Sequence, residues 1–228
     1  RALAVMAGMA LDQAKYGEGE TKRAQRRVDL LVPLCKAFFT DTGLESTIHA
    51  QQVFGGHGYI RETGVEQLVR DVRIAQIYEG TNGIQALDLL QRKVLPKQGE
   101  ALQELHTEVT ELIQQLPPQY QAWGQVVDRA FAELQEVAMT LANHEQQADA
   151  VSSAAVDYLH AMGYATYGYL WLKMLHALPS ASMNEDFKTR KLAIAAFYFA
   201  RLMPRFHMHI ASALAPVQAT MGLDNSDF

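Results

Sequence analysis

The chain has 228 residues, 49% of them hydrophobic and 20% charged, which is enough to bury a substantial core as one domain or two. Its net charge of −5 without a basic stripe argues against nucleic acid as a partner, and no apolar run reaches the roughly 18–20 residues that cross a bilayer. Cys35 is the single cysteine, so the sequence predicts neither a disulfide framework nor a cysteine-based metal site, as is typical of the reducing cytoplasm.

Helical periodicity fills the first part of the chain, and no alternating strand pattern or hairpin turn interrupts it. The predicted helices cover residues 1–16, 22 or 28 to 53, 65–77 and 83–94. Pro33 is expected only in the first turns of its helix or at a kink, because proline removes a backbone donor. The chain begins in mid-helix without an initiator Met, so we expect it to be a piece of a longer protein, incomplete at its N-terminus.

The second part begins after a weak boundary at Pro96 and Gly99, where the composition changes. Its predicted helices cover residues 100–116, 119–143, 149–178 and 187–214, and the tail 222–228 is expected to fray. Four helices with short breaks predict a second antiparallel bundle. We therefore expect an all-α protein with one helical domain at residues 1–96 and an appended C-terminal helical bundle at residues 97–228.

A short break at residues 78–83 places one carboxylate between two helices. Gly80 frees the backbone there, while Asn82 can cap the next helix and Gln85 can close a capping box. Glu79 is flanked by apolar neighbours, which predicts a partly desolvated carboxylate that could act as a general base beside an anion-friendly helix start. Spacing alone equally permits a surface glutamate without chemistry, and does not decide between the two.

A helical i, i+4 pair, Glu45 and His49, could ligate a metal. No second Glu-x-x-His set exists in the sequence to build a di-iron bundle. The pair is therefore interpreted as a helix-surface contact, and no metal site is predicted.

Two motifs carry a specific resemblance. The pattern Gln-x-x-Gly-Gly-x-Gly-Tyr at residues 52–59 and the pattern Arg-Asp-x-Arg-Ile-x-x-Ile-Tyr-Glu-Gly-Thr at residues 70–81 closely resemble the C-terminal helical domain of acyl-CoA dehydrogenases, over about residues 1–95. Residues 97–228 resemble the helical extension of a larger-sized subgroup. In the first part of the chain, the runs 51–62 and 77–86 are similar to 3-methylmercaptopropionyl-CoA dehydrogenases.

The resemblance implies an FAD-dependent oxidoreductase that forms a 2,3-enoyl-CoA. Glu79 would remove the α-proton of an acyl-CoA thioester while the β-hydrogen leaves as hydride to the flavin. Tyr78 would wall the substrate pocket, and Gly80 would let the thioester approach the backbone. The residues that match cofactor-binding positions of the family are Gln52, Gly55, Gly56, Thr81 and Asn82.

The resemblance also implies partners. The segment around Gln52 matches one that reaches the FAD of a neighbouring subunit, which implies a homodimer or homotetramer, with an electron-transfer flavoprotein as acceptor. Because family members carry further domains before this part, we expect the chain alone to have little affinity for FAD and no turnover. The rival interpretation is a helical scaffold or oligomerisation module that keeps the fold without the chemistry.

Overall fold

The structure is a computed structural model that describes residues 1–145, 147–223 and 226. The regular secondary structure of this part of the chain is helical and includes no strand, which confirms the all-α prediction. None of its helices is both long and apolar enough to pass through a membrane. The α-helices are α1 (Ala2–Tyr16), α2 (Thr21–Val53), α3 (Val65–Ile77), α4 (Asn82–Leu87), α5 (Glu100–Gln114), α6 (Gln121–Ala142), α7 (Gln147–Ala177), α8 (Glu185–Phe197), α9 (Arg205–Ala213) and α10 (Gln218–Met221).

Short 3-10 and π-helical segments connect these helices. The 3-10 segments are η1 (Gly55–Gly58), η2 (Arg61–Thr63), η4 (Pro96–Gly99) and η5 (Pro118–Tyr120). The π-helical segments are η3 (Asp88–Val94), which continues α4, and η6 (Tyr198–Leu202), which continues α8. The helix predicted over 83–94 is therefore present, but its second half is π-helical.

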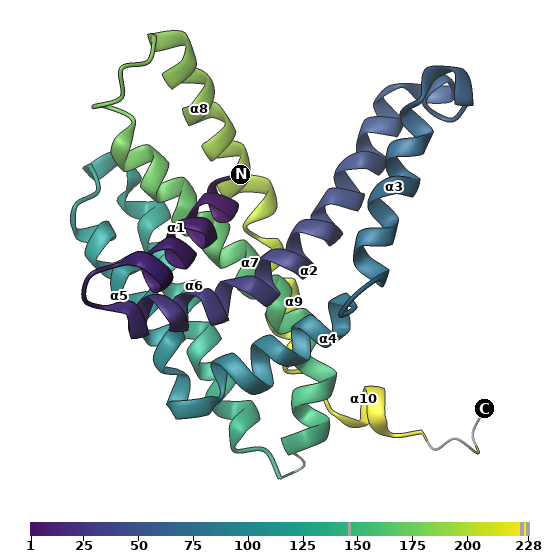
Figure 1. The fold of residues 1–228 in the computed structure, drawn as a ribbon, viewed down its shortest axis with the longest axis vertical. Helices are drawn as coiled ribbons and strands as arrows, with labels where there is room; N and C mark the ends of the chain where they lie inside the picture. Colours follow the sequence, from purple (N-terminus) through teal and green to yellow (C-terminus); the bar gives the residue numbers. More distant parts are fainter. Residues whose placement is uncertain (146, 224–225, 227–228) are drawn as a thin grey trace.

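The α2–α3 hairpin stands out from the rest of the molecule (Figure 1). α2 extends to the glycine-rich turn at the tip of the hairpin, and α3 returns from it to the body of the molecule. α3 covers residues 65–77, as predicted. At 13 residues, α3 is roughly 20 Å long by the rise of an α-helix. The tip and the base of the hairpin are therefore well separated.

Pro33 lies inside α2, beyond the first turns, which were one of the two places predicted for it; the other was a kink. The missing N–H and the ring clash cost roughly 3 kcal/mol in a helix interior. Pro33 is buried, and its neighbours Leu30, Leu31 and Leu34 are completely buried. We infer that burial of this apolar face offsets the local cost, so the helix continues.

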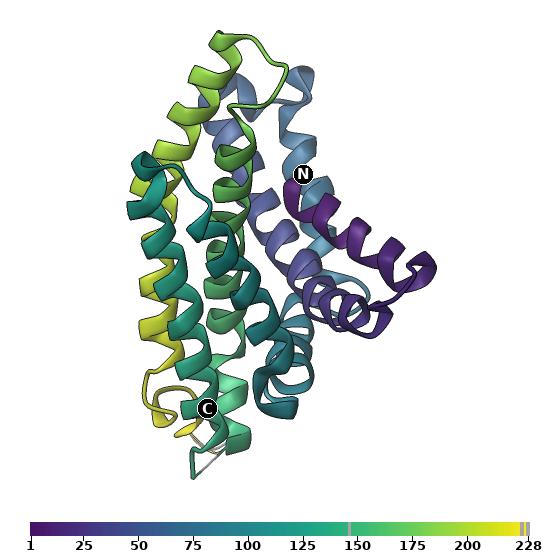
Figure 2. The ribbon, with the colours of Figure 1, turned by 90° about the vertical axis from the view of Figure 1, so that its left-hand side faces the viewer.

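The second part forms a C-terminal bundle, by which we mean α5 to α9. Its helices run alongside one another (Figure 2), and α7 contacts both α6 and α9. α7 is rich in Ala, Gly and Tyr, and the close helix contact that this composition predicts is present. A Cβ at Gly163 would lie 2.4 Å from the ring of Phe38, and one at Gly168 would lie 2.9 Å from Val127.

The predicted single helix over 187–214 is wrong. α8 passes into η6, a turn follows at Met203 and Pro204, and α9 begins at Arg205. Proline cannot donate the backbone hydrogen bond that a continuous helix requires, and Pro204 instead becomes the N-cap of α9. Of the tail predicted to fray, residues 224, 225, 227 and 228 lie outside the described residues.

One hydrophobic core connects the two parts. It includes Leu34 and Phe38 of α2, Leu134 of α6 and Tyr158 of α7. Ion pairs follow the same junction, since Arg27 of α2 lies 2.7 Å from Glu108 of α5. The predicted division between residues 96 and 97 stays a prediction.

Candidate functional site

The Glu79 loop, residues 78–81, links α3 to α4 at the base of the hairpin. The N–H of Tyr78 donates the last helical hydrogen bond to Ile74 (3.1 Å), and Glu79 and Gly80 then take φ values of 34° and 72°. A Cβ at Gly80 would lie 2.6 Å from the side chain of Gln85. Glycine is therefore favoured at position 80 by its left-handed backbone, while the flexible Gln85 side chain could move to relieve the close approach.

The predicted capping role of Asn82 is wrong. Thr81 is the N-cap residue of α4, and no side chain caps this helix. Asn82 is the first residue of α4, and its side chain turns into the protein, where Lys36 donates to its Oδ1 at 2.8 Å. The Lys36 ammonium thus binds the amide oxygen of Asn82, and the Thr40 hydroxyl and Asp41 carboxylate accept from its nitrogen, so these groups of α2 compete successfully with the cap.

Glu79 is exposed to solvent in the chain. Its flanking residues Ile77 and Tyr78 are themselves 49% and 54% exposed, so the predicted desolvation by these neighbours is wrong. The side chain of Glu79 has no hydrogen bond or ion pair among the described residues. Withdrawing this carboxylate from water therefore requires a covering surface from outside the described chain.

The remaining residues of the predicted site divide between the two ends of the hairpin. Thr81 is exposed and Gly80 half-buried at the base, next to Glu79. Gln52, Gly55 and Gly56 are exposed at the tip, on the far side of α3. One chain therefore does not bring the two predicted groups of cofactor contacts together, and their roles stay predictions.

A polar network at the base of the hairpin was missed by sequence reasoning. Its centre is Asp41 of α2, whose Oδ1 accepts from Gln76 of α3 (2.5 Å) and from Asn82 of α4 (2.6 Å). Nε2 of His160, on α7, donates to Asp41 Oδ2 at 2.9 Å. The available signal was three polar residues, Lys36, Thr40 and Asp41, on an otherwise apolar segment of α2.

The hydrogen bonds at Asp41 control its charge. Burial by itself raises the pKa of this carboxyl, but donation from His160, Gln76 and Asn82 outweighs it, and the pKa is lowered. Ionised Asp41 therefore stabilises the fold above its unfolded pKa of about 3.9, and this contribution is lost as the pH falls through the folded value.

We expect the free energy of unfolding of the wild-type chain to fall more steeply below about pH 4 than that of Asp41→Asn. His160 faces the carboxylate from α7, and Lys36 faces it from α2 through Asn82. Urea denaturation of both proteins between pH 3 and pH 6 measures the difference. Parallel pH profiles would contradict the assignment of this stability to ionised Asp41.

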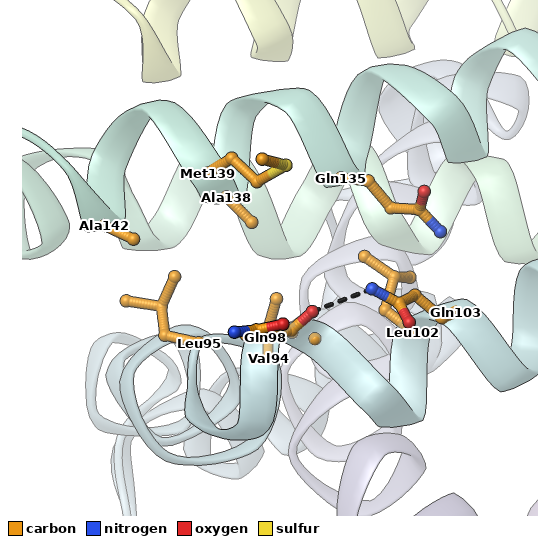
Figure 3. A pocket seen from close by; sticks show the side chains of 10 residues that line it. Val94, Leu95, Gln98, Leu102, Gln103, Gln135, Ala138, Met139 and Ala142 are labelled. Atoms are coloured by element: carbon orange, nitrogen blue, oxygen red, sulfur yellow. Dashed lines mark hydrogen bonds between the residues drawn. The ribbon is translucent and has the colours of Figure 1, made fainter.

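Several hollows lie away from Glu79 in the described chain, and two of them border the C-terminal bundle. One of about 80 Å³ separates α6 from the η4 junction and is lined by uncharged side chains, with Gln103 donating to the Gln98 carbonyl (Figure 3). A larger one of about 480 Å³ lies between α2 and the C-terminal bundle. At its edge Glu45 pairs with Arg205 (2.7 Å), so this carboxylate is already neutralised, which favours the structural interpretation of Glu45 and His49. Glu79 lines neither hollow.

Two family descriptions together match nearly the whole chain. "Acyl-CoA dehydrogenase, C-terminal domain" matches residues 2–94, and "Acetyl-CoA dehydrogenase C-terminal like" matches residues 101–224. The chain belongs to the acyl-CoA dehydrogenase family. The suspected resemblance is thereby confirmed, and the helical architecture is that of acyl-CoA dehydrogenase C-terminal regions.

Curated acyl-CoA dehydrogenases extend the comparison. 3-Methylmercaptopropionyl-CoA dehydrogenase of Ruegeria pomeroyi is 51% identical over 96 residues, which are 42% of this chain and 16% of the relative. A butyryl-CoA dehydrogenase of Syntrophomonas wolfei is 33% identical over 182 residues (76% and 30%). The broad-specificity linear acyl-CoA dehydrogenase FadE5 of Mycobacterium tuberculosis is 24% identical over 200 residues (81% and 33%). The chain thus spans about a third or less of these acyl-CoA dehydrogenases.

Proposed function

We propose that the chain is the C-terminal part of an FAD-dependent acyl-CoA dehydrogenase in which Glu79 removes the α-proton of the substrate. The observation that carries the proposal is the family match, together with a carboxylate that no described side chain binds, on a left-handed loop between two helices. A base must be free to accept a proton, and Glu79 is free. The flavin, when bound, accepts the β-hydrogen as hydride.

Glu79 needs a dry environment to act on a weakly acidic C–H bond, and the described chain leaves it exposed. The proposal therefore assigns the covering surface to the rest of the enzyme and to the acyl-CoA itself. The exposed apolar side chains of Ile77 and Tyr78 support this, because such a patch is suited to contact with an apolar partner. Tyr78 would wall the acyl group, and Gly80 leaves the backbone open to the thioester.

The two predicted groups of cofactor contacts fit an oligomer better than a single chain. Thr81 would approach one FAD at the base of the hairpin, together with the backbone of Asn82, whose side chain is held by α2. Gln52, Gly55 and Gly56 at the tip would approach the FAD of a second subunit, and no atom lies near a Cβ built at either glycine, so a ligand can reach this backbone. We propose a homodimer or homotetramer on this ground, with an electron-transfer flavoprotein as acceptor.

The substrate class is an acyl-CoA thioester. The 51% identity to a 3-methylmercaptopropionyl-CoA dehydrogenase favours 3-methylmercaptopropionyl-CoA, while the matches to butyryl-CoA and linear acyl-CoA dehydrogenases favour straight chains. The alternative function is a non-catalytic helical scaffold, which the exposure of Glu79 in the chain favours.

The test uses the complete protein that contains this chain, purified with its flavin. We expect at least one of 3-methylmercaptopropionyl-CoA, butyryl-CoA and a long linear acyl-CoA to bleach the oxidised flavin without oxygen. The 228-residue chain, assayed in parallel, is expected to retain no FAD and show no turnover. A flavin that no thioester reduces would favour the scaffold, and turnover by the chain alone would contradict the need for the rest of the enzyme.

A further inference from the structure

Two amide side chains bracket Glu79 symmetrically and meet at one oxygen. Gln76 lies three residues before Glu79 and Asn82 three residues after it. Both donate to Oδ1 of Asp41, at 2.5 Å and 2.6 Å. We call Asp41, Gln76 and Asn82 the Asp41 clamp. One carboxylate of α2 thus holds both ends of the Glu79 loop.

The loop needs such a restraint. Glu79 has φ 34°, which is uncommon for a residue with a side chain and persists only where the surroundings impose it. Because no hydrogen bond or ion pair from the described side chains orients its carboxylate, the direction of Glu79 depends on the backbone of residues 78–81. That backbone is fixed at its two ends, where the Asp41 clamp acts.

The clamp is itself supported from α2. Lys36 donates to Oδ1 of Asn82 at 2.8 Å, and the Asn82 amide also donates to Thr40 at 2.9 Å. The Asn82 side chain is therefore held at both its oxygen and its nitrogen. This leaves it a single orientation, with its amide directed at Asp41.

The C-terminal bundle supplies a third donor. His160 of α7 donates to the second oxygen of Asp41 and stacks on His209 of α9, with ring centroids 5.0 Å apart. Nδ1 of His209 in turn lies 2.8 Å from Asp157. A connected path therefore leads from two helices of the bundle to the ends of the Glu79 loop.

We propose that Asp41 is a positioning residue for Glu79, holding both ends of the Glu79 loop so that the carboxylate points at the substrate, and that His160 joins this clamp to the C-terminal bundle. The inference rests on the proposed role of Glu79 as the base. It gives the bundle a part in the chemistry that is separate from packing.

A matched control distinguishes positioning from general stability. Asp128 of α6 pairs with His106 of α5 at 2.8 Å, nearly the same geometry as the pair between Asp41 and His160. Among the described residues, the side chain of Asp128 has its hydrogen bond and ion pair with His106 and none with the Glu79 loop. Removing either carboxylate breaks one Asp–His pair, but only the removal of Asp41 is expected to release the Glu79 loop.

The kinetic test compares Asp41→Ala, Asp41→Asn and Asp128→Ala in the complete enzyme, with flavin content measured for each. Asp41→Ala is expected to slow flavin reduction on the order of 10- to 100-fold with little change in KM, as expected for a misplaced catalytic group. Asp41→Asn restores much of this loss, because its Oδ1 still accepts from both amides and neutral His160 can accept from its Nδ2. Asp128→Ala should leave the rate within about twofold of wild type.

A second readout does not need activity. In the 228-residue chain, Asp41→Ala should speed hydrogen exchange at the amides of Tyr78, which donates to the Ile74 carbonyl, and Gln85, which donates to the carbonyl of the last loop residue, Thr81, while Asp128→Ala should not. If Asp41→Ala fails to fold, Gln76→Ala, at a helix position that tolerates alanine, should show the same changes to a smaller degree.

Equal effects of Asp41→Ala and Asp128→Ala on the rate of flavin reduction and on hydrogen exchange would overturn the proposed positioning role of Asp41. So would a loss that appears only in KM, or an Asp41→Asn enzyme as slow as Asp41→Ala. A wild-type enzyme that reduces no flavin would instead defeat the proposed function, and the exchange experiment would still decide whether Asp41 holds the loop.

Discussion

Replacing Glu79 with Gln in the complete enzyme is expected to slow flavin reduction by about 10²- to 10⁴-fold while FAD stays bound. Glutamine has nearly the same shape as glutamate but cannot accept the proton. The side chain of Glu79 makes no hydrogen bond or ion pair within the described chain, so the substitution removes no contact that holds the fold. Stopped-flow measurement of flavin bleaching by acyl-CoA gives the rate directly.

Glu18→Gln is the matched control, because Glu18 is also an exposed glutamate in a short connection between two helices. We expect it to leave the rate unchanged. If Glu79→Gln bleached its flavin as fast as wild type, Glu79 would lose the role of base. A loss of bound FAD in Glu79→Gln would instead assign the residue to the cofactor site rather than to proton transfer.

Local patterns predicted the local structure well. The spacing of Val65, Leu68, Val69 and Val72 fixed α3 at residues 65–77, as observed, because hydrophobic periodicity and a following Gly80 determine where such a helix can begin and end. The prolines predicted the ends of helices less reliably. Pro33 continued a helix and Pro204 ended one, since burial of the surrounding face decides the outcome and burial is a property of the whole fold.

The site was predictable only in part. Glu79 and Gly80 lie together in a motif, and the left-handed backbone that the glycine suggested is present. Asp41 is 35 residues from Gln76 and 119 from His160, and no period in the sequence connects them. The sequence left open whether Glu79 is desolvated or at the surface, and in the chain it is exposed. Apolar neighbours in sequence desolvate a side chain only if they are themselves covered.

Replacing Phe38 with Ala is expected to destabilise the 228-residue chain by about 3–5 kcal/mol, the usual cost of deleting a buried aromatic side chain. Phe38 is completely buried between α2 and α7, and its ring meets those of Tyr167 and Tyr164 edge-on at centroid distances of 5.0 Å and 5.2 Å. Gly163 lies against the same ring and provides no side chain to fill the space that alanine would leave. Chemical denaturation followed by circular dichroism measures the change.

The control is Val32→Ala, at an exposed position of the same helix, which should change stability by less than about 0.5 kcal/mol. Because the ring of Phe38 joins the hairpin to the C-terminal bundle within one core, the chain should unfold in a single transition, and Phe38→Ala should shift it as a whole. Two transitions, of which Phe38→Ala moved only the first, would mean that the two parts fold independently. In that case α7 would be a poor support for Asp41, since His160 could hold the clamp only while both parts stay packed together.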